Sequence, residues 1–336
     1  MQEKSTPAAH YHLPGLFEFY ELYKVFLPLW RAHREWFYGW CDIGSVYGAP
    51  ADCLWGGGRA GFGEARADDV LALMSEYGIS SRLTFSNSLL RKEHLSDRKC
   101  NELCRMFEKE VSASSSAALP SVQNGVSKVE VEPVVAEHCR SLETSVQNGV
   151  IVHSDLLAEY LKANYPSLYL VSSTTKVLTD FDDFESELNK ADFKFVVPDF
   201  RLNKEFNRLA MLTQSQKDKT EFLCNECCDF GCKNRKNCYE NVSLKNLGEE
   251  VPEHKCSSPD AAVGYRFSLA MKNRAFIGVH DILETYLPMG FSNFKIEGRG
   301  LGSAVVLEFL LYYMTKPEHQ LEVREAVYLD SMLDLF

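Results

Sequence analysis

The chain has 336 residues, of which 45% are hydrophobic and 12% aromatic, enough for a sizeable core, so a globally disordered chain is excluded. Its formal net charge of -11 argues against a protein that holds nucleic acid through a generally basic surface. No apolar stretch approaches the ~20 residues that span a bilayer, and the N-terminus lacks the order of a secretory signal. We therefore expect a soluble, cytoplasmic protein of one large domain or two.

The first third of the chain predicts helices and strands in alternation. Apolar periodicity predicts an aromatic-rich helix over residues 16–38, lying on the main body, and amphipathic helices over 68–77 and 94–110. Strands are expected at 40–48 and 79–85. The alternation indicates an α/β fold.

A glycine-rich loop follows the first predicted strand. Four glycines between residues 56 and 61, with Gly63, form a loop whose backbone amides could approach a ligand closely. The loop lacks the spacing of either nucleotide-binding glycine fingerprint. A ligand-contacting loop and a plain structural loop both remain open.

The composition shifts to Ser, Ala, Val and Glu from about residue 112 to 149. Ser-Val-Gln-Asn-Gly-Val occurs at residues 121–126 and again at 145–150. Two copies do not make a solenoid. We expect a low-complexity insertion at the edge of the fold that carries no chemistry, Cys139 included.

The second half of the chain repeats a strand-and-helix unit. The predicted strands are 150–152, 168–171, 193–197, 220–223, 276–279 and 291–296. The predicted helices are 155–164 (capped by Ser154), 181–190, 203–212, 280–287, 302–314 and a closing helix over 318–334.

Eight strand-helix units can be counted, which favours a (β/α)₈ TIM-type barrel over an open doubly wound sheet. The expected organisation is an N-terminal helical segment at 1–38, the barrel at 39–316 and a C-terminal helix at 317–336. The insertion and a cysteine-rich loop at 224–256 interrupt the barrel.

Polar side chains follow the predicted strands, and in a barrel these ends share one mouth. A single such residue is more often a cap or a loop contact, but convergence on one pocket better explains the set. The members are Asn87, His153, residues 172–176, Asp199, Arg201, Asn225, Glu226, Lys295, Glu297 and Arg299.

Six of the eleven cysteines fall between residues 224 and 256. A reducing compartment makes metal binding more plausible than disulfides, and an odd count leaves one cysteine unpaired. Crowded, uneven spacing favours an iron–sulfur cluster over zinc, while zinc and no metal at all remain alternatives. The ligands we favour are Cys228, Cys232, Cys238 and Cys256, with Cys227 and Cys224 as alternates. Cys41 and Cys53 are expected to be core thiols.

The last predicted strand ends in Phe-Lys-Ile-Glu-Gly-Arg at residues 294–299, where Lys295 and Glu297 share one face. Arg299, near the start of a helix, could hold an anionic group; an internal ion-pair network is the alternative. The motif resembles the Lys-Ile-Glu-Gly-Arg motif of the collagenase-like peptidases, peptidase family U32. The resemblance covers roughly residues 40–310 without the insertion. The chain lacks that family's compact cysteine signature, so it resembles a divergent member.

The resemblance implies a barrel, a four-iron cluster held by upstream cysteines in several members, and either peptidase activity or oxygen-independent hydroxylation of RNA bases or a quinone precursor. No nucleophile elbow or His-Glu-x-x-His is present, which favours redox chemistry over hydrolysis. A non-catalytic barrel that binds a partner is the alternative from another class.

Within that reading, the candidate catalytic residues are His153, Glu297 and Lys295. Candidate substrate-binding residues are Arg299, Asn87, Asp199, Arg201 and Lys176. The substrate could be a small molecule or a macromolecule, anionic ones included.

Overall fold

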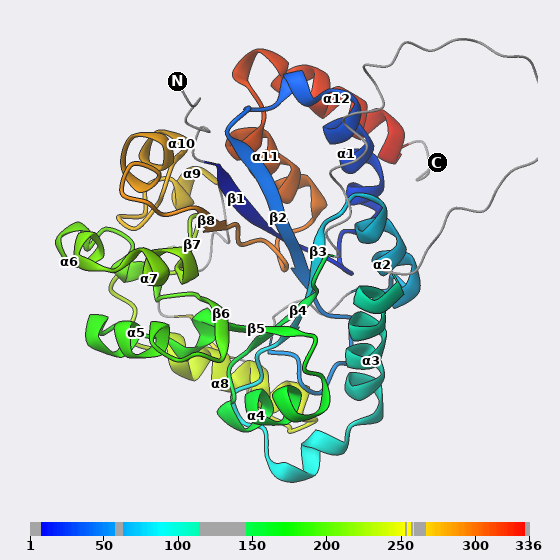
Figure 1. The fold of residues 1–336 in the computed structure, drawn as a ribbon, viewed down its shortest axis with the longest axis vertical. Helices are drawn as coiled ribbons and strands as arrows, with labels where there is room; N and C mark the ends of the chain where they lie inside the picture. The colour runs from blue at the N-terminus through cyan, green and yellow to red at the C-terminus, as the bar shows by residue number, and fades with distance from the viewer. Residues whose placement is uncertain are drawn as a thin grey trace, which may run out of the picture.

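The computed structural model describes residues 8–57, 63–113, 146–252, 254–256, 258 and 267–332. Eight parallel strands form one sheet in the order β6-β5-β4-β3-β2-β1-β8-β7 (Figure 1). The strands are β1 (Ala9–Pro14), β2 (Cys41–Gly48), β3 (Ser80–Phe85), β4 (Gly149–Val152), β5 (Tyr169–Ser172), β6 (Phe193–Val196), β7 (Glu221–Leu223) and β8 (Asn293–Lys295). A parallel bridge between Val196 and Thr220 joins the two outer strands. The sheet is therefore closed, and the predicted TIM-type barrel is confirmed.

The N-terminal strand β1 differs from the prediction. Residues 9–14 pair with β2 on one side and β8 on the other, so they belong to the barrel rather than to a helical segment at 1–38. Conversely, 276–279 is not a strand, because 276–278 are irregular and Val279 begins a helix. The predicted number of strands was right, but one member of the set was wrong.

Helices surround the closed sheet (Figure 1). The α-helices are α1 (Tyr20–Ala32), α2 (Ala67–Glu76), α3 (Arg98–Ala113), α4 (Asp155–Asn164), α5 (Phe181–Leu188), α6 (Phe206–Met211), α7 (Gln214–Lys219), α8 (Arg235–Asn246), α9 (Phe267–Ala270), α10 (Val279–Asp281), α11 (Ser303–Met314) and α12 (Gln320–Met332). Shorter turns are η1 (Arg34–Trp36), η2 (Lys92–Ser96), η4 (Thr174–Lys176), η5 (Phe200–Leu202), the π-helical η7 (Ile282–Tyr286) and η8 (Pro317–His319).

Local signals in the sequence explain several helix boundaries. The predicted cap of α4 is present, since the Ser154 side chain accepts a hydrogen bond from the Leu157 amide at 3.3 Å. The aromatic helix begins only at Tyr20, after the Gly15 turn, and packs against the closing helix α12. None of the described helices is long and apolar enough to cross a membrane.

The predicted insertion ends earlier than expected. Residues 114–145, which include Cys139, lie outside the described residues. Asn148 already belongs to the barrel, because its side chain accepts from the Ser81 amide at 2.9 Å and donates to the Phe107 carbonyl at 3.1 Å. Gly149 opens β4 against the Tyr169 ring, where a Cβ atom would lie 2.4 Å from a ring carbon. A side chain there would displace the ring.

The core has two layers, as the alternation of side chains along buried strands requires. The larger layer lies between the sheet and the helices and takes in most of the buried aromatic and aliphatic residues. The smaller layer fills the barrel lumen with Tyr47, Ile151, Tyr169, Val171, Val197 and Leu223. The rest of the lumen holds charged groups.

Candidate functional site

Four ionisable side chains meet inside the barrel lumen. Glu221 of β7 accepts from Arg82 Nη1 of β3 at 2.5 Å and from Lys295 Nζ of β8 at 3.1 Å. His12 of β1 places Nε2 3.5 Å from the same carboxylate. These side chains are at most 6% exposed, so solvent does little to screen them. We call this set, His12, Arg82, Glu221 and Lys295, the lumen network.

Neighbouring side chains fix the orientation of the network. Arg82 Nε donates to the Tyr169 hydroxyl at 2.8 Å, and His12 Nδ1 lies 2.9 Å from the Ser45 hydroxyl. The Lys295 ammonium sits 3.9 Å from the centre of the Tyr47 ring. The ring face attracts a cation, so Lys295 has a second favourable contact besides Glu221.

The protonation states of the network follow from burial and charge. Burial lowers the pKa of Lys295 to about 8, against the pull of Glu221 and with the help of Arg82. Burial alone would raise the pKa of Glu221, but Arg82, His12 and Lys295 hold it well below its usual range. Burial and then Arg82 lower the pKa of His12. Near neutral pH the network therefore holds one carboxylate, one guanidinium and an amine able to exchange its proton.

The end of β8 continues from the network to the rim of the barrel. Glu297 follows two residues after Lys295, and the intervening Ile296 packs away from the lumen in the outer core. The Glu297 amide donates to Asn225 Oδ1 at 2.7 Å, and Asn225 Nδ2 donates to the Glu297 carbonyl at 3.0 Å. These two hydrogen bonds fix the ends of β7 and β8 to each other.

Two carboxylates and a thiol converge at this rim. Ligand atoms of Glu226, Cys227 and Glu297 all lie within 4.8 Å of one another, and Cys227 Sγ is 4.0 Å from Glu297 Oε1. Among the described residues, this is the group of three side chains arranged so that they could share a metal ion. Sequence reasoning had placed Glu226 and Glu297 at the mouth but treated Cys227 as an alternate ligand of a different set.

A second chain of charges anchors the cysteine-rich segment, residues 224–256. Buried Arg235 at the start of α8 pairs with Glu226 and, at 3.5 Å, with Asp199. Asp199 also lies 3.3 Å from Arg201, which donates to the backbone carbonyls of Phe230 and Cys232 at 3.0 and 2.7 Å. Asp199 and Arg201, predicted to bind substrate, are thus engaged in positioning the segment.

The four cysteines predicted as metal ligands do not form one cage. Within the described part of the chain, Cys228, Cys232, Cys238 and Cys256 yield no group of three sulfurs close enough to hold an ion. Burial raises the pKa of Cys228 to about 12. Which of these cysteines bind a metal, and which metal they bind, therefore stays a prediction. The alternate Cys224 is fully buried in the outer core.

Comparison with known proteins adds one structure. No family model matches the chain, and no curated protein does either. A solved structure titled "The Structure of the U32 Peptidase Mk0906" is similar, with a TM-score of 0.46 and 13% sequence identity. The match covers 89% of this chain and 96% of that chain. The similarity concerns the fold alone.

Two predicted residues lie on the β4–β5 side of the barrel, apart from the lumen network. His153 Nδ1 is 2.9 Å from the Thr175 hydroxyl, and burial, followed by Lys176 and Lys236, lowers the pKa of His153 to about 4. Lys176 is bound by Glu187 at 2.7 Å and Asp155 at 3.0 Å. Neither residue is brought together with Lys295 or Glu297 by any contact found in the described chain.

The remaining predicted residues make structural contacts. Asn87 is fully buried and donates to the carbonyls of Leu54 and Ser243 at 3.1 and 3.2 Å, so it joins the end of β3 to α8. Arg299 is paired with buried Glu18 at 2.6 Å. The internal ion pair weighed as an alternative for Arg299 is therefore the arrangement observed, and its charge is neutralised.

Sequence reasoning missed three members of the lumen network, His12, Arg82 and Glu221. It searched only the strand ends, while these residues lie inside strands. A signal was available, because a buried parallel strand is normally a continuous apolar run. Arg82 and Glu221 are charged residues within two strands predicted to be buried, and two charges of opposite sign in buried strands predict an interior pair.

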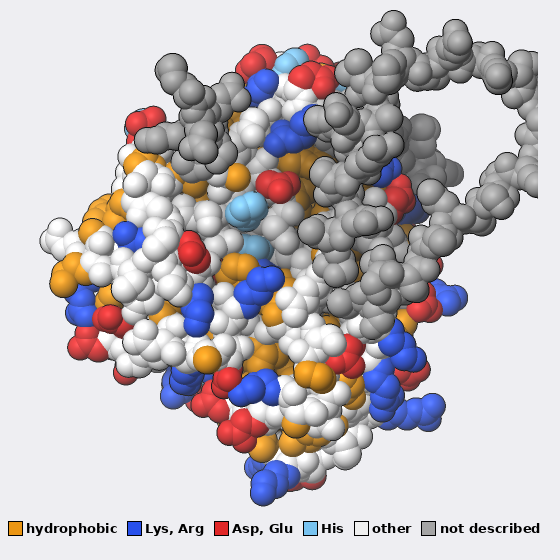
Figure 2. Space-filling model, in the orientation of Figure 1, with side chains coloured by type: hydrophobic (Ala, Val, Ile, Leu, Met, Phe, Trp, Pro, Cys, Tyr) orange, Lys and Arg blue, Asp and Glu red, His pale blue; other side chains and the backbone are white. Residues whose placement is uncertain are grey.

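Charge on the visible face of the molecule is mixed. Figure 2 shows basic and acidic side chains interspersed over the part of this face where Figure 1 places α3, α4 and α5. The described residues in this view do not gather into a broad basic surface.

Proposed function

We propose that the chain is a divergent U32-type barrel enzyme whose chemistry takes place at the ends of β7 and β8. The observation that carries the proposal is the lumen network directly below Glu297. Desolvating an ion costs several kcal/mol, and apolar side chains would fill a barrel interior without that cost. Ionised groups in the interior are therefore better explained by a role in chemistry than by a role in stability. Barrel enzymes place their catalytic groups at this end of the strands.

The residues at this site have distinct proposed roles. Lys295, with a pKa of about 8, takes up or gives a proton and attracts an anionic group of the substrate. Glu297 lies at the rim and acts on the substrate side, held in place by Asn225. Glu221 and Arg82 are positioning residues, because they set the protonation of Lys295 without reaching the rim.

Two kinds of cofactor chemistry are proposed as alternatives at this rim. Zinc would find two carboxylates and a thiolate at Glu226, Cys227 and Glu297, with a position left for water, which suits hydrolysis. An iron–sulfur enzyme that hydroxylates its substrate is the second candidate. The proximity of Cys228 and Cys232, whose charges act on each other, favours it. That candidate requires the cysteines to converge further than they do here.

One purification separates these alternatives. The full chain is isolated anaerobically, and its iron, sulfide and zinc contents and visible absorption are measured. Bound zinc that is lost in Cys227→Ser supports the hydrolytic candidate. Iron and sulfide in equal amounts, with broad visible absorption, support the iron–sulfur candidate. A protein that contains neither zinc nor iron and sulfide would contradict both cofactor proposals. Acid–base chemistry without a cofactor would then be the remaining candidate.

The enzymatic proposal itself is tested by turnover. The chain is assayed on peptides and on small anionic substrates, with each metal supplied, and Glu297→Gln and Lys295→Met are compared with the parent. We expect each variant to lose at least ~100-fold in rate, the lower range for a positioned acid–base group. Lys92→Met, at an exposed lysine of η2, is the matched control and should retain activity. Full activity in both site variants would overturn the proposal.

A further inference from the structure

Cys53 and Cys100 form a pair of thiols outside the candidate site. Their sulfur atoms are 3.1 Å apart, and both side chains are buried, with exposed fractions of 6% and 0%. A disulfide bond is about 2.05 Å long, so joining them requires a movement of about 1 Å. Both cysteines are free in the structure. Sequence analysis had treated Cys53 as a core thiol only.

The two cysteines come from different elements. Cys53 lies in the loop after β2, just before Trp55, whose indole donates to the His94 carbonyl at 2.7 Å. Asn246 of α8 donates to the Gly56 carbonyl at 2.5 Å. Gly57 lies so close to Ser86 that a Cβ atom would be 2.4 Å from its carbonyl carbon. The loop therefore connects η2, the end of β3 and α8.

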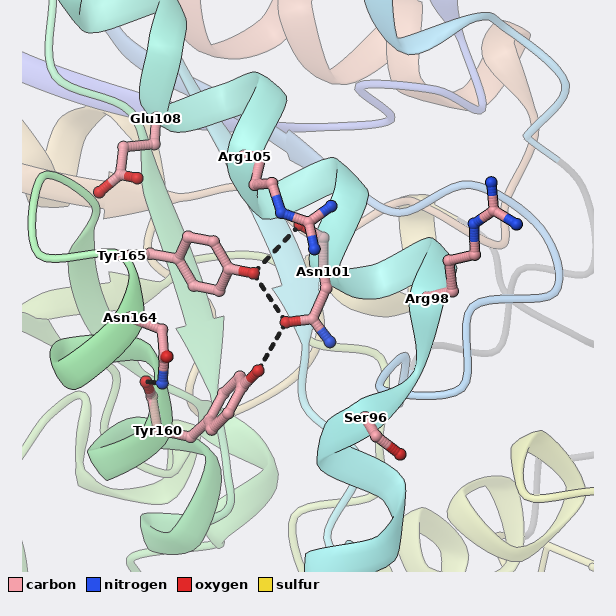
Figure 3. A pocket seen from close by; sticks show the side chains of 8 residues that line it. All are labelled: Ser96, Arg98, Asn101, Arg105, Glu108, Tyr160, Asn164 and Tyr165. Atoms are coloured by element: carbon pink, nitrogen blue, oxygen red, sulfur yellow. Dashed lines mark hydrogen bonds between the residues drawn. The ribbon is translucent and has the colours of Figure 1, made fainter.

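The partner cysteine is on a firmly held helix. Asn101, next to Cys100, accepts hydrogen bonds from the hydroxyls of Tyr160 and Tyr165 at 2.8 and 2.7 Å, as Figure 3 shows. Its amide also donates to the carbonyls of Leu95 and Asp97. These contacts lie beside a groove of about 590 Å³ between α3 and α4. The first turns of α3 are thus fixed, so the loop is the part that adjusts.

The pair is chemically asymmetric. The two thiols share a hydrogen bond in which either sulfur could be the donor, and this contact lowers the pKa of Cys53 and raises that of Cys100. The thiolate is the form that attacks an oxidant, so Cys53 reacts first and Cys100 follows. Cys104, one turn along α3, is also buried and faces the same region. Cys100 is the direct partner, because its sulfur is the one found in contact with that of Cys53.

We propose that Cys53 and Cys100 are a site of reversible oxidation, forming a disulfide that ties the loop after β2 to α3. The oxidant is a peroxide. The Cys53 thiolate attacks one peroxide oxygen, the O–O bond breaks, and the sulfur becomes a sulfenic acid while the other oxygen leaves as water after taking up a proton. The Cys100 sulfur then attacks Cys53, the S–O bond breaks, and the hydroxide departs as a second water with the Cys100 proton. Two thiols and hydrogen peroxide give one disulfide and two waters.

Peptide mapping of the full chain tests the proposal. The reduced protein is treated with hydrogen peroxide, the remaining thiols are blocked, and the digest is analysed by mass spectrometry. We expect a linked pair of peptides containing Cys53 and Cys100, lighter by two hydrogen atoms than the separate peptides. Dithiothreitol should release them. Amide hydrogen exchange in residues 53–57 should slow after oxidation, by about tenfold or more, and recover on reduction.

Matched variants separate this pair from its neighbours. Cys53→Ser and Cys100→Ser should each abolish the linked peptides, while Cys104→Ser should keep them. If a variant fails to fold, the map of the unmodified chain still decides. A map in which exposed Cys227 and Cys256 are oxidised while Cys53 and Cys100 stay reduced would overturn the proposal. So would a link from Cys53 to any cysteine other than Cys100.

Discussion

Glu221 is the residue on which the cations of the barrel lumen converge. Its position inside β7 means that no motif marks it, and its only sequence signal is a charged side chain within a short strand predicted to be buried. The motif at residues 294–299, in contrast, drew attention to Lys295 and Glu297 directly. What the motif could not predict is that Lys295 faces inward to Glu221 and Arg82, because that depends on three strands distant in the sequence.

His153 provides a residue-scale prediction about acid stability. Its pKa of about 4 lies below the usual value, so the unfolded chain binds more protons between pH 4 and 6.5 and stability falls as the pH falls through that range. When the pH is lowered from 7 to 5, the free energy of unfolding should decrease in both proteins. We expect the decrease to be about 1–2 kcal/mol smaller in His153→Gln than in the parent. Urea unfolding at both pH values measures this difference.

The control is His280→Gln, which alters an exposed histidine. It should leave the pH dependence close to that of the parent. Equal losses for the parent and His153→Gln between the two pH values would show that the folded chain does not disfavour a charged His153.

Arg299 shows the limit of residue-level reasoning from sequence. Its place at a strand end and beside a helix start predicted an anion site or an ion pair. The partner, Glu18, is 281 positions away in the sequence and follows β1. Since β1 was not recognised as a strand, nothing in the sequence placed Glu18 beside β8, and the choice between the two alternatives could not be made.

At the scale of elements, the cysteine-rich segment is held by charge rather than by apolar packing. In α8 only Arg235 and Ser243 are buried, and Arg235 is paired with Glu226 and Asp199. Such a helix has no apolar stripe, so periodicity cannot predict it. The sequence indicated only a loop at 224–256, and the contacts that shape it are tertiary.

Truncating Arg235 should therefore loosen this segment selectively. Arg235→Gln leaves Glu226 and Asp199 buried without their shared cation, a change that costs about 3–5 kcal/mol for a buried pair. We expect proteolysis between residues 224 and 256 to accelerate while the barrel strands stay protected. Limited proteolysis with mass spectrometry reads out the cleavage sites.

The neighbouring Lys236→Gln is the matched control, because Lys236 is exposed. It should be cleaved at the rate of the parent. If Arg235→Gln resists proteolysis as well as Lys236→Gln does, the ion pairs do not hold the segment.

Strand β1 was missed for a physical reason. It alternates His10, Tyr11, His12 and Leu13, with His12 in the charged lumen and its neighbours Tyr11 and Leu13 fully buried in the outer core. An inward-facing histidine breaks the continuous apolar run that marks a buried parallel strand. By contrast β4, which was predicted correctly, carries Val150, Ile151 and Val152 as a continuous apolar run.

At the scale of the whole molecule, β1 joins the two parts of the barrel. It lies between β2 and β8, so the run β6 to β2 and the pair β8 and β7 meet through it. Chain order would have suggested a peripheral N-terminal segment. The sequence pattern predicted a closed barrel only as a class of fold. In the closed sheet, residues 9–14 occupy the position between β2 and β8.

Leu13→Ala tests whether β1 is integral to the fold. Leu13 is fully buried, so the substitution should cost about 2–5 kcal/mol of unfolding free energy. Leu321→Ala, at a side chain that is 59% exposed, should cost less than about 0.5 kcal/mol. Urea unfolding compares the two, and similar small losses would place residues 9–14 outside the cooperative unit.

The central claim, that a charged lumen beneath Glu297 prepares Lys295 for proton transfer, is tested most directly by the titration of Lys295 itself. Nuclear magnetic resonance of the lysine side chains in the full chain, assigned by comparison with Lys295→Arg, follows this amine through pH 6 to 11 (a range of roughly two to three units around the expected midpoint). The expected midpoint is about 8. A midpoint near 10.4, about that of an unperturbed lysine, would contradict the account.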